Sequence, residues 1–503
     1  MNARESFPRL LLAEWTKLRS VSRWVITLIG AAALTIGLSY LAASGNKTNI
    51  NAHADFVTGP HGEPVADAFY FVHQQVTGDA TLTVRVASLT PVPGRAQLNP
   101  REGDSLVPLN DPSPFAQPAA GIMIKDSTRP GSSYASVMLT AAQGVYMQWD
   151  FDADRKGSAS SGARWLRLVR SGNAITGYES ADGAAWQKIG TATPKNLPST
   201  AEIGFYVSSP ATVYTSRGGG SSSVTERPTS AQATFDNVQL GSGGTWHGVP
   251  VGDQARLDEK GGVSGGGQVT EANGGYAVVG TGKVGPRPPD DDMVEAALIG
   301  VIAGLMALIA IGVLYATSEY RRGMIRTTLA ATPRRGRVLA AKAIVLGTTS
   351  FLVGLAGAVG SFVLAIPVLR KQGFTPPGFP RPSLTDGSVL RALLLTAAFM
   401  AGVAVVGLAI GVLLRHSAAA ITITIVLVLG PLIIGMILPG TSPKWLMYTT
   451  LAGGMATQRA KPPTITLAEP WAMIGPWAGI GVVAAWAAVT LGLAWWQLRK
   501  RDA

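Results

Sequence analysis

Six long runs of apolar residues occur along this chain. They lie at about residues 24–44, 293–317, 343–368, 389–414, 418–438 and 473–498. Each run exceeds the roughly 18 residues that mark a membrane-spanning helix, and a helix of about 20 residues crosses a hydrocarbon layer of about 30 Å. The pattern predicts an α-helical polytopic membrane protein with six transmembrane helices.

The first run follows a segment with its own helical period. Within residues 1–23, apolar side chains recur on one helical face at Phe7, Leu11, Trp15 and Leu18. We expect an amphipathic helix in the membrane interface, with Trp15 at headgroup depth, rather than a solvated tail. Small residues after the first run would also suit a cleaved signal peptide, but the long leader and the 20-residue apolar core favour a retained span.

Between the first and second runs the period changes from helical to two. Apolar and polar side chains alternate at residues 82–86, 145–151 and 203–207, and less regularly at 235–240. Asp182-Gly183 lies between Tyr178 and Trp186 and indicates a hairpin turn. We expect residues 45–292 to form an all-β sandwich, with a small β-rich appendage from about residue 245.

The distribution of charge indicates how the chain is oriented in the membrane. The chain has a net charge of +12 and only 14% charged residues, but residues 45–292 carry a net −4 and the remainder +16. This places the positive charge beside the apolar runs, as the positive-inside rule requires, and argues against a nucleic-acid partner. We expect a multi-pass protein of the cell membrane with both termini cytoplasmic and residues 45–292 extracellular.

Sequence signatures of enzymes are weak. Gly280-Thr281-Gly282-Lys283-Val284 lacks the first glycine and the final hydroxyl of a phosphate-binding loop, and no paired-carboxylate motif of a sandwich glycosidase is present. With no cysteine in the chain, thiolate chemistry and disulfides are excluded. We expect no enzyme and no cofactor bound by this chain.

Three aspartates at alternate positions could bind calcium. Asp150, Asp152 and Asp154 would share one face of a strand. Arg155 stands where the EF-hand pattern requires glycine, so a solvated strand end is the favoured interpretation.

Glycine pairs within the runs predict close helix packing. Gly300 and Gly304 are four apart in the second run, and Gly407 and Gly411 are four apart in the fourth. Gly430-Pro431 predicts a kink in the fifth run.

The runs carry no charge at their centres. Glu295 and Arg391 lie near the outer ends, so no ionisable group is placed to couple transport to an ion gradient. Energy for transport would have to come from a partner on the inner side. The long inner stretch, residues 318–342, carries one acid, Glu319, and seven basic residues, namely Arg321, Arg322, Arg326, Arg334, Arg335, Arg337 and Lys342.

Two segments resemble known families. Residues 165–186, WLRLVRSGNAITGYESADGAAW, resemble the concanavalin A-like jelly-roll sandwiches of lectins and laminin-G-type modules, and the likeness extends over about residues 65–240. It implies a sandwich that binds a glycan or another cell-envelope ligand.

The membrane part resembles the permease subunits of type-2 ABC exporters. Glu14-Trp15-Thr16-Lys17-Leu18 matches the pattern of their elbow helix, where Glu14 and Lys17 are spaced to pair. The loop after the second run matches a second family pattern through Glu319, Gly323, Leu329, Pro333, Arg334 or Arg335, and Lys342, although Met324 replaces a common threonine. The likeness covers residues 1–44 and 293–503.

This second resemblance implies a mechanism. Ser318–Lys342 would couple the permease to a separate ATPase subunit that holds ATP and Mg²⁺, and a second permease copy would complete a homo- or heterodimer. The cargo would be amphiphilic or lipid-like, a peptide or a drug. The residues implied in coupling are Glu319, Arg321, Arg322, Gly323, Arg326, Pro333, Arg334, Arg335 and Lys342.

Three alternatives remain open from the sequence. The arginines of residues 318–342 could act only as topology signals and anionic-lipid contacts. The whole chain could be a membrane-anchored glycan- or ligand-binding or sensory protein without transport activity. An outer-face hydrolase would require activity that depends on Asp150 or Asp152.

Overall fold

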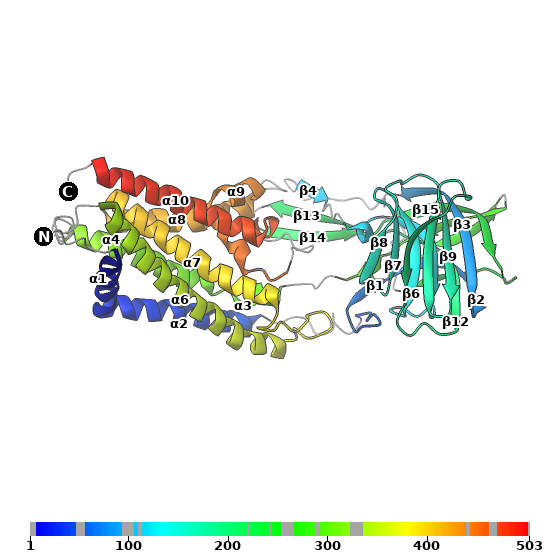
Figure 1. The fold of residues 1–503 in the computed structure, drawn as a ribbon, viewed down its shortest axis with the longest axis horizontal. Helices are drawn as coiled ribbons and strands as arrows, with labels where there is room; N and C mark the ends of the chain where they lie inside the picture. Colours follow the sequence, from blue (N-terminus) through cyan, green and yellow to red (C-terminus); the bar gives the residue numbers. More distant parts are fainter. Residues whose placement is uncertain are drawn as a thin grey trace.

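The molecule is elongated, with helices at one end and β-sheets at the other (Figure 1). The computed structural model describes residues 7–46, 56–92, 105–108, 113–218, 221–241, 243–252, 266–272, 274–287, 292–321, 335–438, 443–461 and 470–500. Both chain termini lie at the free end of the helical part, called here the terminal end. The opposite end of the bundle, which faces the sheets, is called the β end.

The helical part contains the six predicted apolar helices and several short ones. The helices are α1 (Phe7–Ser20), α2 (Ser22–Gly45), α3 (Met293–Ala297), α4 (Val301–Arg321), α6 (Arg335–Lys371), α7 (Gly387–Leu414), α8 (Ser417–Ile437), α9 (Pro443–Thr449) and α10 (Pro476–Lys500), with 3-10 turns η3 (Leu451–Gln458) and η4 (Pro470–Met473). Six helices are long and apolar enough to cross a membrane: α2, α4, α6, α7, α8 and α10.

Helix α7 forms the centre of the bundle. It packs against α4, α6 and α10, and most of its side chains are buried. Helices α2, α8 and α10 lie at the periphery and expose large apolar side chains, such as Ile26, Val426 and Val489. Such outward apolar surface is what a lipid-facing helix requires.

Two boundaries differ from the predicted ones. The second run is not one helix, because a turn at residues 298–300 separates α3 from α4. The third helix begins at Arg335 rather than near Ala343, so the last part of the basic stretch is helical. Neither boundary could be predicted from hydropathy. The turn at residues 298–300 is as apolar as the helices beside it, and the first turns of α6 are too polar to be counted in an apolar run.

The β part is built on two antiparallel seven-stranded sheets with a small three-stranded sheet beside them. Its strands are β1 (Val65–Asp67), β2 (Phe69–Thr77), β3 (Ala80–Val92), β4 (Ser105–Pro108), β5 (Ala119–Lys125), β6 (Tyr134–Thr140), β7 (Gly144–Trp149), β8 (Ala153–Lys156), β9 (Arg164–Ser171), β10 (Ala174–Ser180), β11 (Gln187–Ala192), β12 (Thr200–Ser208), β13 (Thr212–Gly218), β14 (Ser221–Arg227), β15 (Ser230–Leu240), β16 (His247–Val251), β17 (Gln268–Ala272), β18 (Gly275–Gly280) and β19 (Val284–Pro286).

The two large sheets pack face to face through alternate side chains. One has the order β11-β10-β9-β3-β15-β18-β17 and the other β16-β2-β12-β5-β6-β7-β8. Leu82, Val84 and Phe235 of the first sheet meet Ile203 and Phe205 of the second in one buried cluster. The predicted alternation therefore places these residues in the core, as period-two strands require.

The region after residue 245 is not a separate appendage. Strand β16 pairs with β2 at the edge of one sheet, and β17 and β18 extend the other beside β15. Strand β19 returns to pair with β1. The prediction of an appendage was wrong because pairing between strands far apart in sequence leaves no local signal.

The turn at Asp182-Gly183 joins β10 and β11 as predicted. Backbone N–H groups of Ala185 and Ala184 and the Ser180 hydroxyl donate to the Asp182 carboxylate, which lowers the pKa of Asp182 to about 2. Gly183 adopts φ +79° and packs against the Trp165 ring.

The three-stranded sheet has the order β14-β13-β4 and lies between the sandwich and the bundle (Figure 1). Both β13 and β14 contact α8.

Candidate functional site

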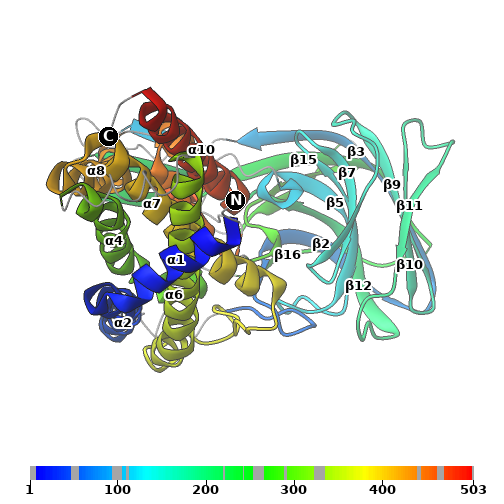
Figure 2. The ribbon, with the colours of Figure 1, turned by 60° about the vertical axis from the view of Figure 1, so that its left-hand side comes forward.

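Helix α1 lies across the terminal ends of α2 and α6 (Figure 2). Its outward face exposes Leu12 and Trp15, whereas Glu14 and Leu18 point into the bundle. The helix therefore carries a carboxylate into an apolar interior, and this carboxylate needs partners there.

Those partners come from α4 and α6. Lys342 Nζ donates to Glu14 Oε2 at 2.9 Å and to Glu319 Oε1 at 2.6 Å. The Tyr315 hydroxyl donates to Glu14 Oε2 at 2.6 Å, and Lys17 forms an ion pair with Glu319. We call Glu14, Lys17, Tyr315, Glu319 and Lys342 the elbow cluster.

The elbow cluster is balanced in charge, and its members are buried except for Lys17, whose side chain is 28% exposed. Glu14 is 4% exposed, Glu319 1% and Lys342 4%. Two carboxylates face two ammonium groups, and the Lys342 ammonium also lies 4.8 Å from the centre of the Tyr315 ring. Removing one member of such a set would leave an uncompensated buried charge, so the cluster fixes the position of α1 against α4 and α6.

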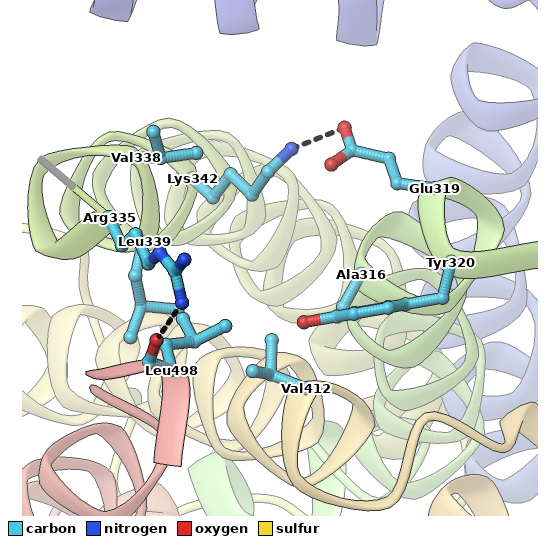
Figure 3. A pocket seen from close by; sticks show the side chains of 9 residues that line it. All are labelled: Ala316, Glu319, Tyr320, Arg335, Val338, Leu339, Lys342, Val412 and Leu498. Atoms are coloured by element: carbon cyan, nitrogen blue, oxygen red, sulfur yellow. Dashed lines mark hydrogen bonds and ion pairs between the residues drawn. The ribbon is translucent and has the colours of Figure 1, made fainter. Parts of the chain in front are cut away.

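A small cavity adjoins the cluster. It has a volume of about 20 Å³, is lined by Glu319, Tyr320, Arg335 and Lys342 among others, and is shown in Figure 3. Glu319 Oε2 accepts no hydrogen bond from a described residue. A space of this size holds about one water molecule, which would satisfy the free carboxylate oxygen. On the opposite wall, Arg335 Nη1 donates to the Leu498 carbonyl at 2.8 Å and joins α6 to α10.

The structure separates the predicted coupling residues into two sets. Arg322, Gly323, Arg326, Pro333 and Arg334 lie outside the described residues, as does the side chain of Arg321. Glu319 and Lys342 are described and point inward. Glu319 is thus bound by α1 and α6, not presented to a soluble partner as its position in a basic loop had indicated.

The expected pairing inside the elbow helix also differs. Lys17 pairs with Glu319 of α4, and Glu14 pairs with Lys342 of α6. Sequence reasoning missed Tyr315 altogether. Its signal is its position four residues before Glu319, which places both side chains on one face of α4.

The predicted glycine pairs lie where helices approach closely. A side chain at Gly300 or Gly304 would collide with Thr35 of α2, and the Gly300 N–H donates to Ser39 Oγ at 3.1 Å. Gly407 and Gly411 face the backbone of α4.

The alternating aspartates Asp150, Asp152 and Asp154 do not form a cation site. Asp150 and Phe151 adopt φ +45° and +68° in a turn after β7, so the three aspartates do not share a strand face. The buried Asp150 carboxylate accepts bonds from Ser133, Tyr134 and the Lys195 N–H. Among the described residues no cluster of three potential metal ligands occurs.

A second polar group lies at the β end. Asp292 Oδ1 accepts from the Val294 N–H at 2.9 Å and caps α3, and its Oδ2 accepts from the Ala460 N–H at 2.7 Å. Glu295 Oε1 accepts from Trp471 Nε1 at 2.7 Å. Arg391 Nη2 donates to the Arg459 and Ala460 carbonyls. These contacts tie the α3 segment to the η3–η4 segment.

Comparisons with known proteins add little. No protein-family model matches the chain, and no curated protein matches it. Among solved structures, it is similar to a functionally unknown protein from Saccharomyces cerevisiae, with 13% identity and a TM-score of 0.21 over 35% of this chain and 76% of that one.

Proposed function

We propose that this chain is the permease subunit of an ATP-driven exporter of the ABC type. In this proposal all six apolar helices span the cell membrane, both termini are cytoplasmic and the β part is extracellular. The chain itself binds no nucleotide; ATP and Mg²⁺ belong to a separate ATPase subunit, and a second permease copy completes the pathway.

The observation that carries the proposal is the elbow cluster. It joins an amphipathic helix at the terminal end to the two helices that border residues 322–334. A displacement of that loop by a bound ATPase would move α4 and α6. Through Glu14 and Lys17, the same displacement would move α1 and the directly following α2.

In this arrangement, residues 318–342 have two different roles. Glu319 and Lys342 transmit motion inside the bundle, and the arginines between α4 and α6 contact the partner. An anchor with no moving partner would need no four-charge link between α1, α4 and α6 with three of its charges buried, because hydrophobic packing alone can hold such helices.

The test is purification of the tagged full-length chain from its own cells in a mild detergent. We expect an ATP-binding subunit to co-purify in stoichiometric amount. Arg322→Ala combined with Arg326→Ala should remove it, since both positions lie in the predicted coupling loop. The control, Lys371→Ala with Arg381→Ala, removes two exposed charges, one at the other end of α6 and one beyond it, and should keep it.

Recovery of the chain without any ATP-binding subunit would contradict the proposal. It would favour the alternative in which the helices only anchor an extracellular glycan- or ligand-binding domain.

A further inference from the structure

A cavity of about 300 Å³ lies at the β end of the bundle. Its walls come from the end of α2, from α3 and the start of α4, and from the η3–η4 segment. This volume is at the lower limit for a small-molecule site and suits a headgroup with the first part of an apolar chain.

The cavity is lined by both apolar and polar residues. Its apolar lining includes Ala43, Met293, Ala296, Ile299, Ile302 and Phe374. Its polar lining contains Asn46, Asp292, Glu295, Gln458 and Arg459, together with Trp471. An amphiphile likewise combines an apolar part and a polar part.

The carboxylates of the cavity are already occupied. Asp292 holds the α3 amides through one oxygen and the Ala460 and Lys461 amides through the other. Glu295 accepts from Trp471 and lies 3.4 Å from Arg459 Nε. The acidic groups therefore serve the fold and have little capacity left for a cationic ligand.

Arg459 differs from them. It is 4% exposed, and its Nε forms an ion pair with Glu295 Oε2 at 3.4 Å but makes no hydrogen bond with a described residue. A buried N–H donor without an acceptor is unfavourable, so the guanidinium can still gain from a hydrogen-bonding ligand. The backbone at Arg459 is fixed by Arg391, which binds its carbonyl, so the side chain is held at the cavity. Two N–H₂ groups of a buried guanidinium suit a bidentate oxyanion.

We propose that this cavity binds an amphiphile with an anionic oxygen headgroup, such as a phosphate. The headgroup bonds to the guanidinium of Arg459, and the start of the apolar chain lies against Ile299, Ile302 and Phe374. Ile299 is exposed at the rim, which gives the chain a path toward the surrounding lipid. The inference concerns binding by this chain alone and does not depend on an ATPase partner.

Native mass spectrometry of the full-length chain in neutral detergent tests this. The probes are dodecyl phosphate, phosphatidylglycerol and phosphatidylcholine, and the measured quantity is the apparent Kd of the first bound molecule. At least one anionic probe should bind about ten- to one hundred-fold more tightly than phosphatidylcholine, the range of a charged hydrogen bond. Tight binding of phosphatidylglycerol identifies a membrane lipid as the source, and tight binding of dodecyl phosphate alone identifies a free amphiphile.

Three variants locate the site. Arg459→Gln with Glu295→Gln removes both charges of the pair, so that neither is left uncompensated, and should abolish the anionic preference. Glu295→Gln alone should tighten anion binding because the guanidinium loses its competing carboxylate. Ala43→Phe fills the cavity and should weaken every probe.

Lys444→Gln is the matched control, since it removes an exposed positive charge from the segment between α8 and η3. It should leave the preference unchanged. The proposal is overturned if the double variant keeps the wild-type preference, if Lys444→Gln loses it equally, or if Ala43→Phe binds like the wild type.

Discussion

At the scale of residues, the elbow cluster links three helices of the bundle through charged and hydrogen-bonded side chains. Its four charges and one hydroxyl come from three helices, and each charged group has an opposite charge as a neighbour. Buried ion pairs of this kind add specificity more than net stability, because desolvation offsets their attraction. Their loss one partner at a time is nevertheless costly.

Lys342→Met should lower the free energy of unfolding by about 3–5 kcal/mol, because Glu14 and Glu319 would then lie buried with one ammonium between them. Thermal unfolding of the full-length chain in detergent measures the effect. Arg337→Met removes the same charge from the exposed side of α6 and should change stability by no more than about 0.5 kcal/mol. Equal stability of the two variants would show that Lys342 is not part of a buried network.

Sequence reasoning selected four of the five cluster residues but not their partners. Glu14 and Lys17 were expected to pair within one helix, and Glu319 and Lys342 to face a soluble subunit. Charged residues beside an apolar run are ordinarily read as solvent-facing. Only the position of α1 across α6 brings Glu14 and Lys342, 328 residues apart, into one hydrogen bond.

At the scale of elements, small residues determine how closely α2 and α4 approach. Gly304 lies against the Thr35 hydroxyl and, for an added Cβ, within 2.9 Å of the Ala31 carbonyl. Thr35 is itself buried and donates to that carbonyl at 2.8 Å. Gly304 therefore faces both the side chain of Thr35 and the backbone of α2.

Gly304→Val should separate the two helices and cost about 1–3 kcal/mol, the range of an overpacked core. Gly37→Val is the control, because an added Cβ there meets nothing within 4 Å and both variants put valine in a helix. Thermal unfolding of the two proteins in the same detergent gives the comparison. A Gly304→Val protein as stable as Gly37→Val would mean that α2 and α4 do not pack as described.

The number of long apolar helices was predictable from the length of the apolar runs, and the central β strands were predictable from their period of two. The turn at residues 298–300 was not, since its residues are as apolar as the helices it separates. Strands β16, β17 and β18 were expected apart from the sandwich because their partners lie far away along the chain.

At the scale of the whole molecule, the proposed topology places the two ends of the bundle in different compartments. The chain contains no cysteine, so a single introduced cysteine reports its own side of the membrane. Lys188 of β11, in the sandwich, and Arg337, in the first turn of α6, are both exposed.

Lys188→Cys should react with a membrane-impermeant maleimide in intact cells. Arg337→Cys should react only after the membrane is opened, because the positive-inside rule places that end in the cytoplasm. Labelling is read from a shift in gel mobility, and the cysteine-free parent chain is the blank. Reaction of Arg337→Cys in intact cells would reverse the orientation.

The small sheet between the sandwich and the bundle affects how force passes through the molecule. Strands β13 and β14 contact α8, and a seven-residue antiparallel ladder holds the two strands together. A hydrogen-bonded ladder of that length resists shear far better than a single extended peptide linker. In the proposed topology, a load applied to the sandwich would therefore reach α8 through this ladder as a push or a tilt.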